Sequence, residues 1–285
     1  MIDLPVQSLT DCFGLGVAGN FAGHLEQAGE DADFAEVSTP AEAPKGIFPY
    51  YLPGDAGFLG VFPLSSDTLK MPPDGATPKL QIEPEAGVLC EIEYNISGEP
   101  VGLRPRAIAA FNDCSIRREG AVKLSEKKNW GPASKGVAER AFAVSEIDFD
   151  GATSALRIAC FLRRGGRTHA YGVDSPLPGY TYYGETLLSW TVDRLNNQTG
   201  GDTPLEPVGS YLAACGSPGR MLIGIGATRY TEFGEQNFLR VGDEAIVIVY
   251  DSRINDAASV ATAVREHFED SLKSASVLVQ TVLAA

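Results

Sequence analysis

The 285-residue sequence predicts a mostly β, α+β fold. Its 31 glycines and 18 prolines require frequent turns, which an all-helical bundle does not have. Short runs rich in Val, Ile, Phe and Tyr recur from residue 80 onward, and such runs indicate strands. Regular helical segments do not separate these runs, so a doubly wound parallel sheet is disfavoured. We therefore expect a mixed β architecture with a few helices.

The predicted elements follow the chain in order. Residues 1–40 predict a short strand, a glycine-rich turn and a helix over 20–28. Residues 41–80 are rich in Pro, Gly, Phe and Tyr, which predicts an ordered, irregular segment packed by aromatic rings. Residues 163–167, with two adjacent glycines, predict a hairpin turn. The remaining predictions are strands at 87–94, 106–111, 156–163, 167–173, 220–226 and 244–251, and helices at 183–196 and 255–272.

Charge and composition exclude several classes of protein. The formal net charge of −14 disfavours a general nucleic-acid binder, because an acidic surface repels phosphates. No stretch is long and apolar enough to span a bilayer. Residues 1–13 lack the basic start and apolar core of a secretion signal. The five cysteines are odd in number and widely spaced, which predicts reduced thiols, so we expect a cytoplasmic protein.

A glycine-rich segment at residues 14–19 fits the pattern G-x-G-x-x-G. In a dinucleotide-binding fold these glycines let the backbone approach a pyrophosphate, and Glu36 lies near the position of a ribose-binding acid. The preceding strand is weak, however, and a Pro-rich aromatic segment follows where βαβ units are required. The pattern therefore only weakly supports a nucleotide-dependent oxidoreductase.

Glu83-Pro84-Glu85 is the first candidate for a metal site. In an extended segment both carboxylates point to one face, where they can bind a hard cation. A solvated strand face is the alternative, and on this motif alone it is favoured. Pro84 cannot donate a ladder hydrogen bond, which predicts an edge or a bulge.

Two loops and a histidine complete the candidate residues. Asp113 follows the apolar run 107–111 and is either a functional residue at a strand end or an ordinary turn aspartate. Residues 127–136 (KKNWGPASKG) are either a structured loop or a basic surface loop. His24 lies on the predicted first helix, and a lone histidine is more often structural than catalytic.

Taken together and in order, these segments resemble the fumarylacetoacetate hydrolase family, specifically its C-terminal catalytic domain. The resemblance covers residues 13–251. It rests on six motifs: GLGVAGNFAGHLE at 14–26, the P-x-x-F-like segment at 44–48, E-x-E at 83–85, N-D-x-x-x-R at 112–117, W…K at Trp130 and Lys135, and F-L-x-x-G-D at 238–243.

The resemblance implies a rolled, mixed β-sandwich that forms a homodimer. It implies a divalent cation, magnesium or else calcium or manganese, held by Glu83, Glu85 and Asp113. It also implies C–C hydrolysis, decarboxylation or isomerisation of a small 2-oxo or 1,3-dioxo acid. Residues 1–75 become an N-terminal strand and lid-helix segment packed on a catalytic domain at 76–285, in one structural unit. No nucleic-acid or membrane partner is expected.

The resemblance also assigns roles to single residues. His24 becomes a general base that activates water, and Lys135 stabilises negative charge on a substrate oxygen. Arg117 either meets a substrate carboxylate or forms an ion pair with an acid, and Thr228, in an altered G-T-P turn, is a substrate-binding candidate. Gln27 departs from the family, since hydrolytic members carry a glutamate there. A catalytically inert binding or structural protein with this fold is therefore the alternative.

Overall fold

A computed structural model describes residues 1–30, 34, 37, 39–40, 42–73, 79–117, 121–201 and 203–285. Within them, the largest sheet has nine strands and both parallel and antiparallel pairs. Its main path runs β1 (Ile2–Asp3), β11 (Arg140–Ala143), β8 (Pro100–Asn112), β7 (Pro84–Tyr94), β14 (Arg220–Gly224), β2 (Phe13–Ala18) and β3 (Gly46–Tyr51), with β10 (Lys135–Val137) and β4 (Leu64–Ser65) joined beside β8.

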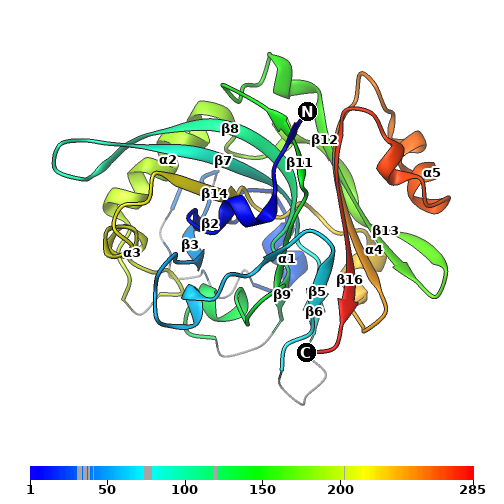
Figure 1. Cartoon of the computed structure of the whole chain (residues 1–285), viewed down its shortest axis with the longest axis horizontal. Helices are drawn as coiled ribbons and strands as arrows, with labels where there is room; N and C mark the ends of the chain where they lie inside the picture. Colours follow the sequence, from blue (N-terminus) through cyan, green and yellow to red (C-terminus); the bar gives the residue numbers. More distant parts are fainter. Residues whose placement is uncertain are drawn as a thin grey trace.

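A second, five-stranded sheet lies beside the first (Figure 1). Its order is β13 (Arg167–Pro176), β12 (Leu156–Arg164), β15 (Glu244–Asp251), β16 (Ala275–Leu283) and β5 (Thr68–Lys70). A short pair, β6 (Leu80–Gln81) and β9 (Ser115–Ile116), completes the described strands. The main apolar core contains side chains of both sheets, among them Val88 and Ile108 of the first and Ile158 and Val247 of the second. Burial of these apolar faces holds the two sheets together.

Five helices of the described residues pack around the sheets: α1 (His24–Ala28), α2 (Gly184–Asn197), α3 (Val208–Ala214), α4 (Glu232–Gln236) and α5 (Ala257–Arg265). Helices α2 and α3 lie against the large sheet, and α5 lies on the outer side of the second sheet (Figure 1). Helix α2 buries Leu187, Leu188 and Leu195 on one face, as an amphipathic helix does.

The predicted mostly β, α+β fold is confirmed, and so is the hairpin, in which Arg164 pairs with Arg167. Several boundaries were wrong. The strand predicted at 87–94 begins at Pro84, and the strand predicted at 106–111 spans Pro100–Asn112. The first helix begins at His24, because Gly23 before it has a left-handed φ of 79°. The strand predicted at 220–226 ends at Gly224, and the helix predicted at 255–272 ends at Arg265. Strands β3, β10, β11 and β16 and helices α3 and α4 are among the elements that were not predicted.

The glycine pattern at residues 14–19 lies mainly in β2, a fully buried strand. A Cβ on Gly14 would lie 2.4 Å from the Tyr50 ring, and one on Gly16 would lie 2.2 Å from the Phe48 ring. These glycines therefore make room for aromatic rings of β3, which removes the main support for a phosphate-binding turn. Glu36, the proposed ribose ligand, lies outside the described residues.

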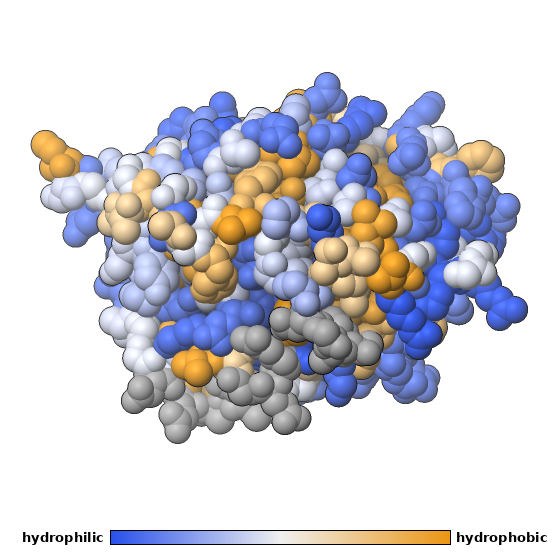
Figure 2. Space-filling model, turned by 60° about the horizontal axis from the view of Figure 1, so that its bottom comes forward, coloured by the Kyte–Doolittle hydropathy of each residue, from blue (hydrophilic) through white to orange (hydrophobic). Residues whose placement is uncertain are grey.

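One face of the surface mixes hydrophilic and hydrophobic residues. Hydrophilic residues cover most of the face in Figure 2, with hydrophobic residues in small groups between them. Among the described residues, no helix combines the length and hydrophobicity needed to cross a bilayer. All five cysteines are described and none forms a disulfide. The expected boundary between residues 75 and 76 lies outside the described residues.

Candidate functional site

Two glutamates and an aspartate meet where β7 begins and β8 ends. Glu83 and Glu85 flank Pro84, which pairs with Asn112 across the antiparallel ladder, so the next residue, Asp113, lies beside them. Oxygens of the three carboxylates lie within 4.8 Å of one another, and all three residues are buried. Strand β7 is an interior strand, so the prediction of an edge was wrong; Pro84 is tolerated because it is the first residue of the strand.

Three buried cations surround two of these carboxylates. Lys128 Nζ lies 2.6 Å from Glu83 Oε2 and 2.5 Å from Asp113 Oδ2. On the other sides, Lys135 Nζ lies 2.6 Å from Asp113 Oδ1, and Arg117 Nη2 lies 2.6 Å from Glu83 Oε1. Every carboxylate oxygen of Glu83 and Asp113 is therefore close to a positive charge.

The pKa values of Glu83 and Glu85 are shifted in opposite directions. Burial opposes the charge of Glu83, but Lys128 and Arg117 hold the pKa of its carboxyl well below the ordinary value. Glu85 forms no ion pair with a described residue; its Oε2 accepts only the Gly226 N–H at 2.9 Å. Burial and the negative charge of Asp113 raise the pKa of Glu85 well above the ordinary value. Glu85 is thus the carboxylate whose charge lacks a partner cation.

His24, the first residue of α1, lies in the same buried region. Its Nδ1 is 3.0 Å from the Thr228 carbonyl oxygen. A carbonyl can only accept, so Nδ1 carries the proton and Nε2 keeps a free lone pair. Burial lowers the pKa of His24 to about 4, which leaves the imidazole neutral at neutral pH. The carbonyl therefore fixes the tautomer without a carboxylate partner.

Gln27, which replaces the family glutamate, holds α1 in place. Its Oε1 accepts the Tyr230 N–H at 2.9 Å, and its Nε2 donates to the Tyr230 carbonyl at 3.2 Å. Only an amide can make both bonds, since a carboxylate has no donor at neutral pH. Gln27 therefore has a structural function that a glutamate cannot perform here.

Replacing Gln27 by glutamate is expected to destabilise the protein by about 1–3 kcal/mol, because the carboxylate faces the Tyr230 carbonyl without a donor. Urea unfolding measures this loss, and faster amide exchange in α1 reports loosening of the helix. Glu26→Gln, an exposed change in the same helix, is the matched control and should leave both unchanged. Equal stability of Gln27→Glu and the parent would contradict the role of this amide.

A small cavity of about 20 Å³ lies at the centre of the site. This volume is enough for about one water molecule, so a substrate cannot enter unless α1 or its surroundings move. The polar residues that line the cavity are His24, Glu30, Glu83, Glu85, Asp113 and Lys128.

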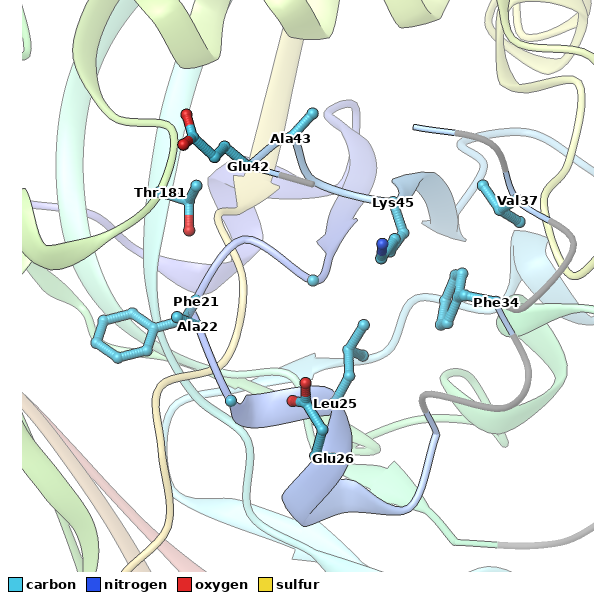
Figure 3. Close-up of a pocket in the computed structure, with 12 residues that line it drawn as sticks. Phe21, Ala22, Leu25, Glu26, Phe34, Val37, Glu42, Ala43, Lys45 and Thr181 are labelled. Atoms are coloured by element: carbon cyan, nitrogen blue, oxygen red, sulfur yellow. The ribbon is translucent and has the colours of Figure 1, made fainter. Parts of the chain in front are cut away.

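A larger cavity of about 510 Å³ adjoins the small one. The two share Gly19, Leu25 and Phe34 in their walls. Leu25 of α1 and Lys45 point into the larger cavity from opposite sides (Figure 3). It is large enough for a small-molecule ligand, and it shares wall residues with the cavity that the carboxylates line.

Of the two alternatives for residues 127–136, the basic surface loop was wrong, because the lysines of this loop are not on the surface. Lys127, Lys128 and Lys135 are all buried. They tolerate burial because Lys127 pairs with Glu30, and the other two pair with site carboxylates. Lys128 was not singled out from the sequence, because nothing in the sequence of the loop indicates which lysine is buried beside an acid.

The other predicted residues fall in different places. Arg117 forms ion pairs with Glu30 and Glu83, which is the second of the two alternatives for this residue. Lys135 contacts Asp113 but does not line the small cavity. Trp130 donates to the Lys70 carbonyl, away from the carboxylates.

Thr228 is buried beside α1. Its carbonyl bonds His24, and its N–H donates to the Pro84 carbonyl at 3.1 Å. Both contacts are made by the backbone, so substrate binding by the Thr228 side chain stays a prediction.

The donor set of the site suits a hard divalent cation, since all three converging groups are carboxylates. The Lys128 ammonium already places a positive charge between two of them, so the position can hold a cation. Glu83, Glu85 and Asp113 are therefore the described residues that fit such an ion.

Comparisons with known proteins agree with this architecture. A crystal structure of a putative fumarylacetoacetate isomerase/hydrolase from Oleispira antarctica matches with a TM-score of 0.52 and 13% identity, over 95% of this chain and 93% of that one. The crystal structure of Cg1458 with an inhibitor matches with a TM-score of 0.51 and 15% identity, over 99% and 78% of the two chains. At these identities the matches show a shared fold.

A search of curated proteins found no match. The model of a family of unknown function, DUF5718, matches residues 30–282, which is most of the chain. The protein therefore belongs to the DUF5718 family and has the fold of fumarylacetoacetate hydrolase-like proteins.

Proposed function

We propose that the protein is a divalent-metal-dependent hydrolase or lyase that breaks a C–C bond of a small 2-oxo or 1,3-dioxo acid. The observation that carries this proposal is the buried convergence of Glu83, Glu85 and Asp113 beside His24. Burial of three carboxylates is costly and is uncommon unless they bind a cation. Magnesium as the ion, a homodimeric assembly and a cytoplasmic location stay predictions.

Glu83, Glu85 and Asp113 would hold the ion. A bound divalent ion supplies a Lewis acid that chelates two substrate oxygens and stabilises an enolate. Glu85 is well suited to contribute to this, because its carboxyl group has no partner cation among the described residues.

His24 would act as the base through Nε2. In a hydrolytic reaction it takes a proton from water, and the resulting hydroxide adds to the carbonyl carbon. The C–C bond then breaks, the acyl part leaves as a carboxylic acid, and the proton returns to the carbon that carried the electron pair. The Thr228 carbonyl keeps Nε2 available throughout, because it holds the Nδ1 proton.

A lysine would stabilise the charge that develops on the substrate. The sequence assigned this role to Lys135, but Lys128 lines the small cavity whereas Lys135 lies behind Asp113. We therefore assign the donor role to Lys128 and a positioning role to Lys135.

An inert binding or structural protein is the competing function. It is favoured by the internal pairing of Glu83 and Asp113, whose oxygens all contact protein cations. A carboxylate cluster that is already neutralised needs no ion for its stability. The two functions differ in turnover and in the response to metal.

The test is a panel of acylpyruvates and oxaloacetate, each with Mg²⁺ or Mn²⁺ and with EDTA as the blank. We expect metal-dependent turnover and a rise in melting temperature on adding the ion. Glu85→Gln should abolish both. Without metal this variant should melt no earlier than the parent, because glutamine still accepts the Gly226 N–H and leaves no unpaired charge.

Absence of a metal-dependent shift in the parent would count against the metal, and absence of turnover on the panel would favour the inert alternative. A metal shift that persists in Glu85→Gln would place the ion elsewhere.

A further inference from the structure

The ammonium of Lys128 bridges two of the three carboxylates that would hold a divalent ion. Its Nζ bridges Glu83 and Asp113 at 2.6 and 2.5 Å, and it lies 4.9 Å from the centre of the Phe48 ring. The residue is 4% exposed. Charge-assisted hydrogen bonds in so buried a place are strong, so a metal ion must compete with this ammonium for the two carboxylates.

The local charges are already balanced. Glu83 and Asp113 are matched by Arg117, Lys128 and Lys135, while Glu85 has no partner cation among the described residues. Adding a doubly charged ion beside all three cations would leave an excess of positive charge in a buried region, which is strongly unfavourable. One cation must therefore move when the ion binds.

Lys128 is the cation that can move. Arg117 is fixed by hydrogen bonds to Gln81 and Tyr230 as well as by its ion pairs. Lys135 is completely buried and also donates to the Cys114 carbonyl. Lys128, by contrast, borders the small cavity, which shares wall residues with the larger cavity, and its four-carbon stem is flexible.

We propose that Lys128 is the resident cation of this site and that a divalent ion binds only by displacing its ammonium from Glu83 and Asp113. This inference rests on the proposed metal-dependent function and deepens it. Metal binding frees the Lys128 ammonium, so one event supplies both the ion and a mobile donor for the substrate. The lysine also sets the metal affinity, because the ion must compete with it.

Calorimetric titration of the metal-free full-length chain with Mn²⁺ tests this competition. Lys128→Met keeps the length of the side chain and removes the ammonium. We expect it to bind Mn²⁺ at least about tenfold more tightly than the parent, because the competitor is gone. Its melting temperature should also rise more on adding Mn²⁺ than that of the parent.

Lys127→Met is the matched control. It removes the same charge from the neighbouring residue, whose amine lies 3.4 Å from Glu30 and not on the three carboxylates. Its Mn²⁺ affinity should stay within about threefold of the parent, which separates direct displacement from a general change in charge.

Equal or weaker binding in Lys128→Met would overturn the inference, and so would equal gains in the two variants. If Lys128→Met does not fold, Lys128→Gln is titrated in its place, because its amide can still donate to one carboxylate. This variant should bind Mn²⁺ at least about threefold more tightly than the parent. No Mn²⁺ binding in any variant would also overturn the inference. Tighter Mn²⁺ binding by Lys128→Met, together with no turnover by the parent, would overturn the proposed function and leave this inference standing.

Discussion

Replacing Asp113 by asparagine is expected to lower the free energy of unfolding by about 3–5 kcal/mol, the typical cost of breaking a buried ion pair on one side. Asp113 is fully buried and pairs with Lys128 at 2.5 Å and with Lys135 at 2.6 Å. Asparagine keeps the shape but turns an NH₂ group toward one of the two ammonium groups. Both lysines then lose a negative partner that water cannot replace.

Urea unfolding of metal-free protein at neutral pH measures this loss. Glu85→Gln is the matched control, because it neutralises a carboxylate of the same cluster that has no ion pair with a described residue. It should cost less than about 1 kcal/mol. Similar losses in the two variants would contradict the pairing of Asp113 with both lysines.

Lowering the pH from 6.5 to about 4 is expected to destabilise the parent through His24. The imidazole is buried and neutral when folded, with its pKa lowered from 6.5 to about 4, whereas the unfolded chain takes up a proton at the ordinary value. The unfolded state binds more protons in this window, so the contribution is complete above pH 6.5 and is lost toward pH 4. Its full size is about 3 kcal/mol.

Unfolding free energies at several pH values between 4 and 8 test this. His24→Asn keeps a donor for the Thr228 carbonyl and removes the titration, so its stability should fall less on acidification than that of the parent. His267→Asn removes an exposed imidazole with a φ of 60°, which asparagine tolerates, and should follow the parent. Parallel curves for the parent and His24→Asn would contradict a buried neutral imidazole.

Strands β12 to β15 could be predicted because each is indicated by its own local sequence pattern. Residues 156–163 are a mostly apolar run, a Gly-Gly turn follows at 165–166, and residues 167–173 return as the second strand, so that β12 and β13 form a hairpin. Strand β16 was missed although its side chains alternate in burial. It is defined by pairing with β15 and with β5, whose residues are 68–70, and no local pattern shows so distant a partner.

The candidate site likewise contains residues that a local pattern predicts and residues that depend on distant partners. Glu83 and Glu85 could be predicted because an extended segment places alternate side chains on one face. Lys128 could not be predicted, because its burial depends on two acids from different strands. Gln27 was seen as a departure from the family, but its partner, the Tyr230 backbone, lies some two hundred residues away.

The missing side chain at Gly16 has a consequence beyond the packing of β2. The Phe48 ring occupies the space where a Cβ on Gly16 would lie, and Lys128 Nζ lies 4.9 Å from the centre of the same ring. Gly16, which carries no charge, thus leaves room for the ring that packs near the Lys128 ammonium. A methyl group at position 16 would push on the Phe48 ring. The displaced ring would in turn disturb Lys128 and the two acids with which it pairs.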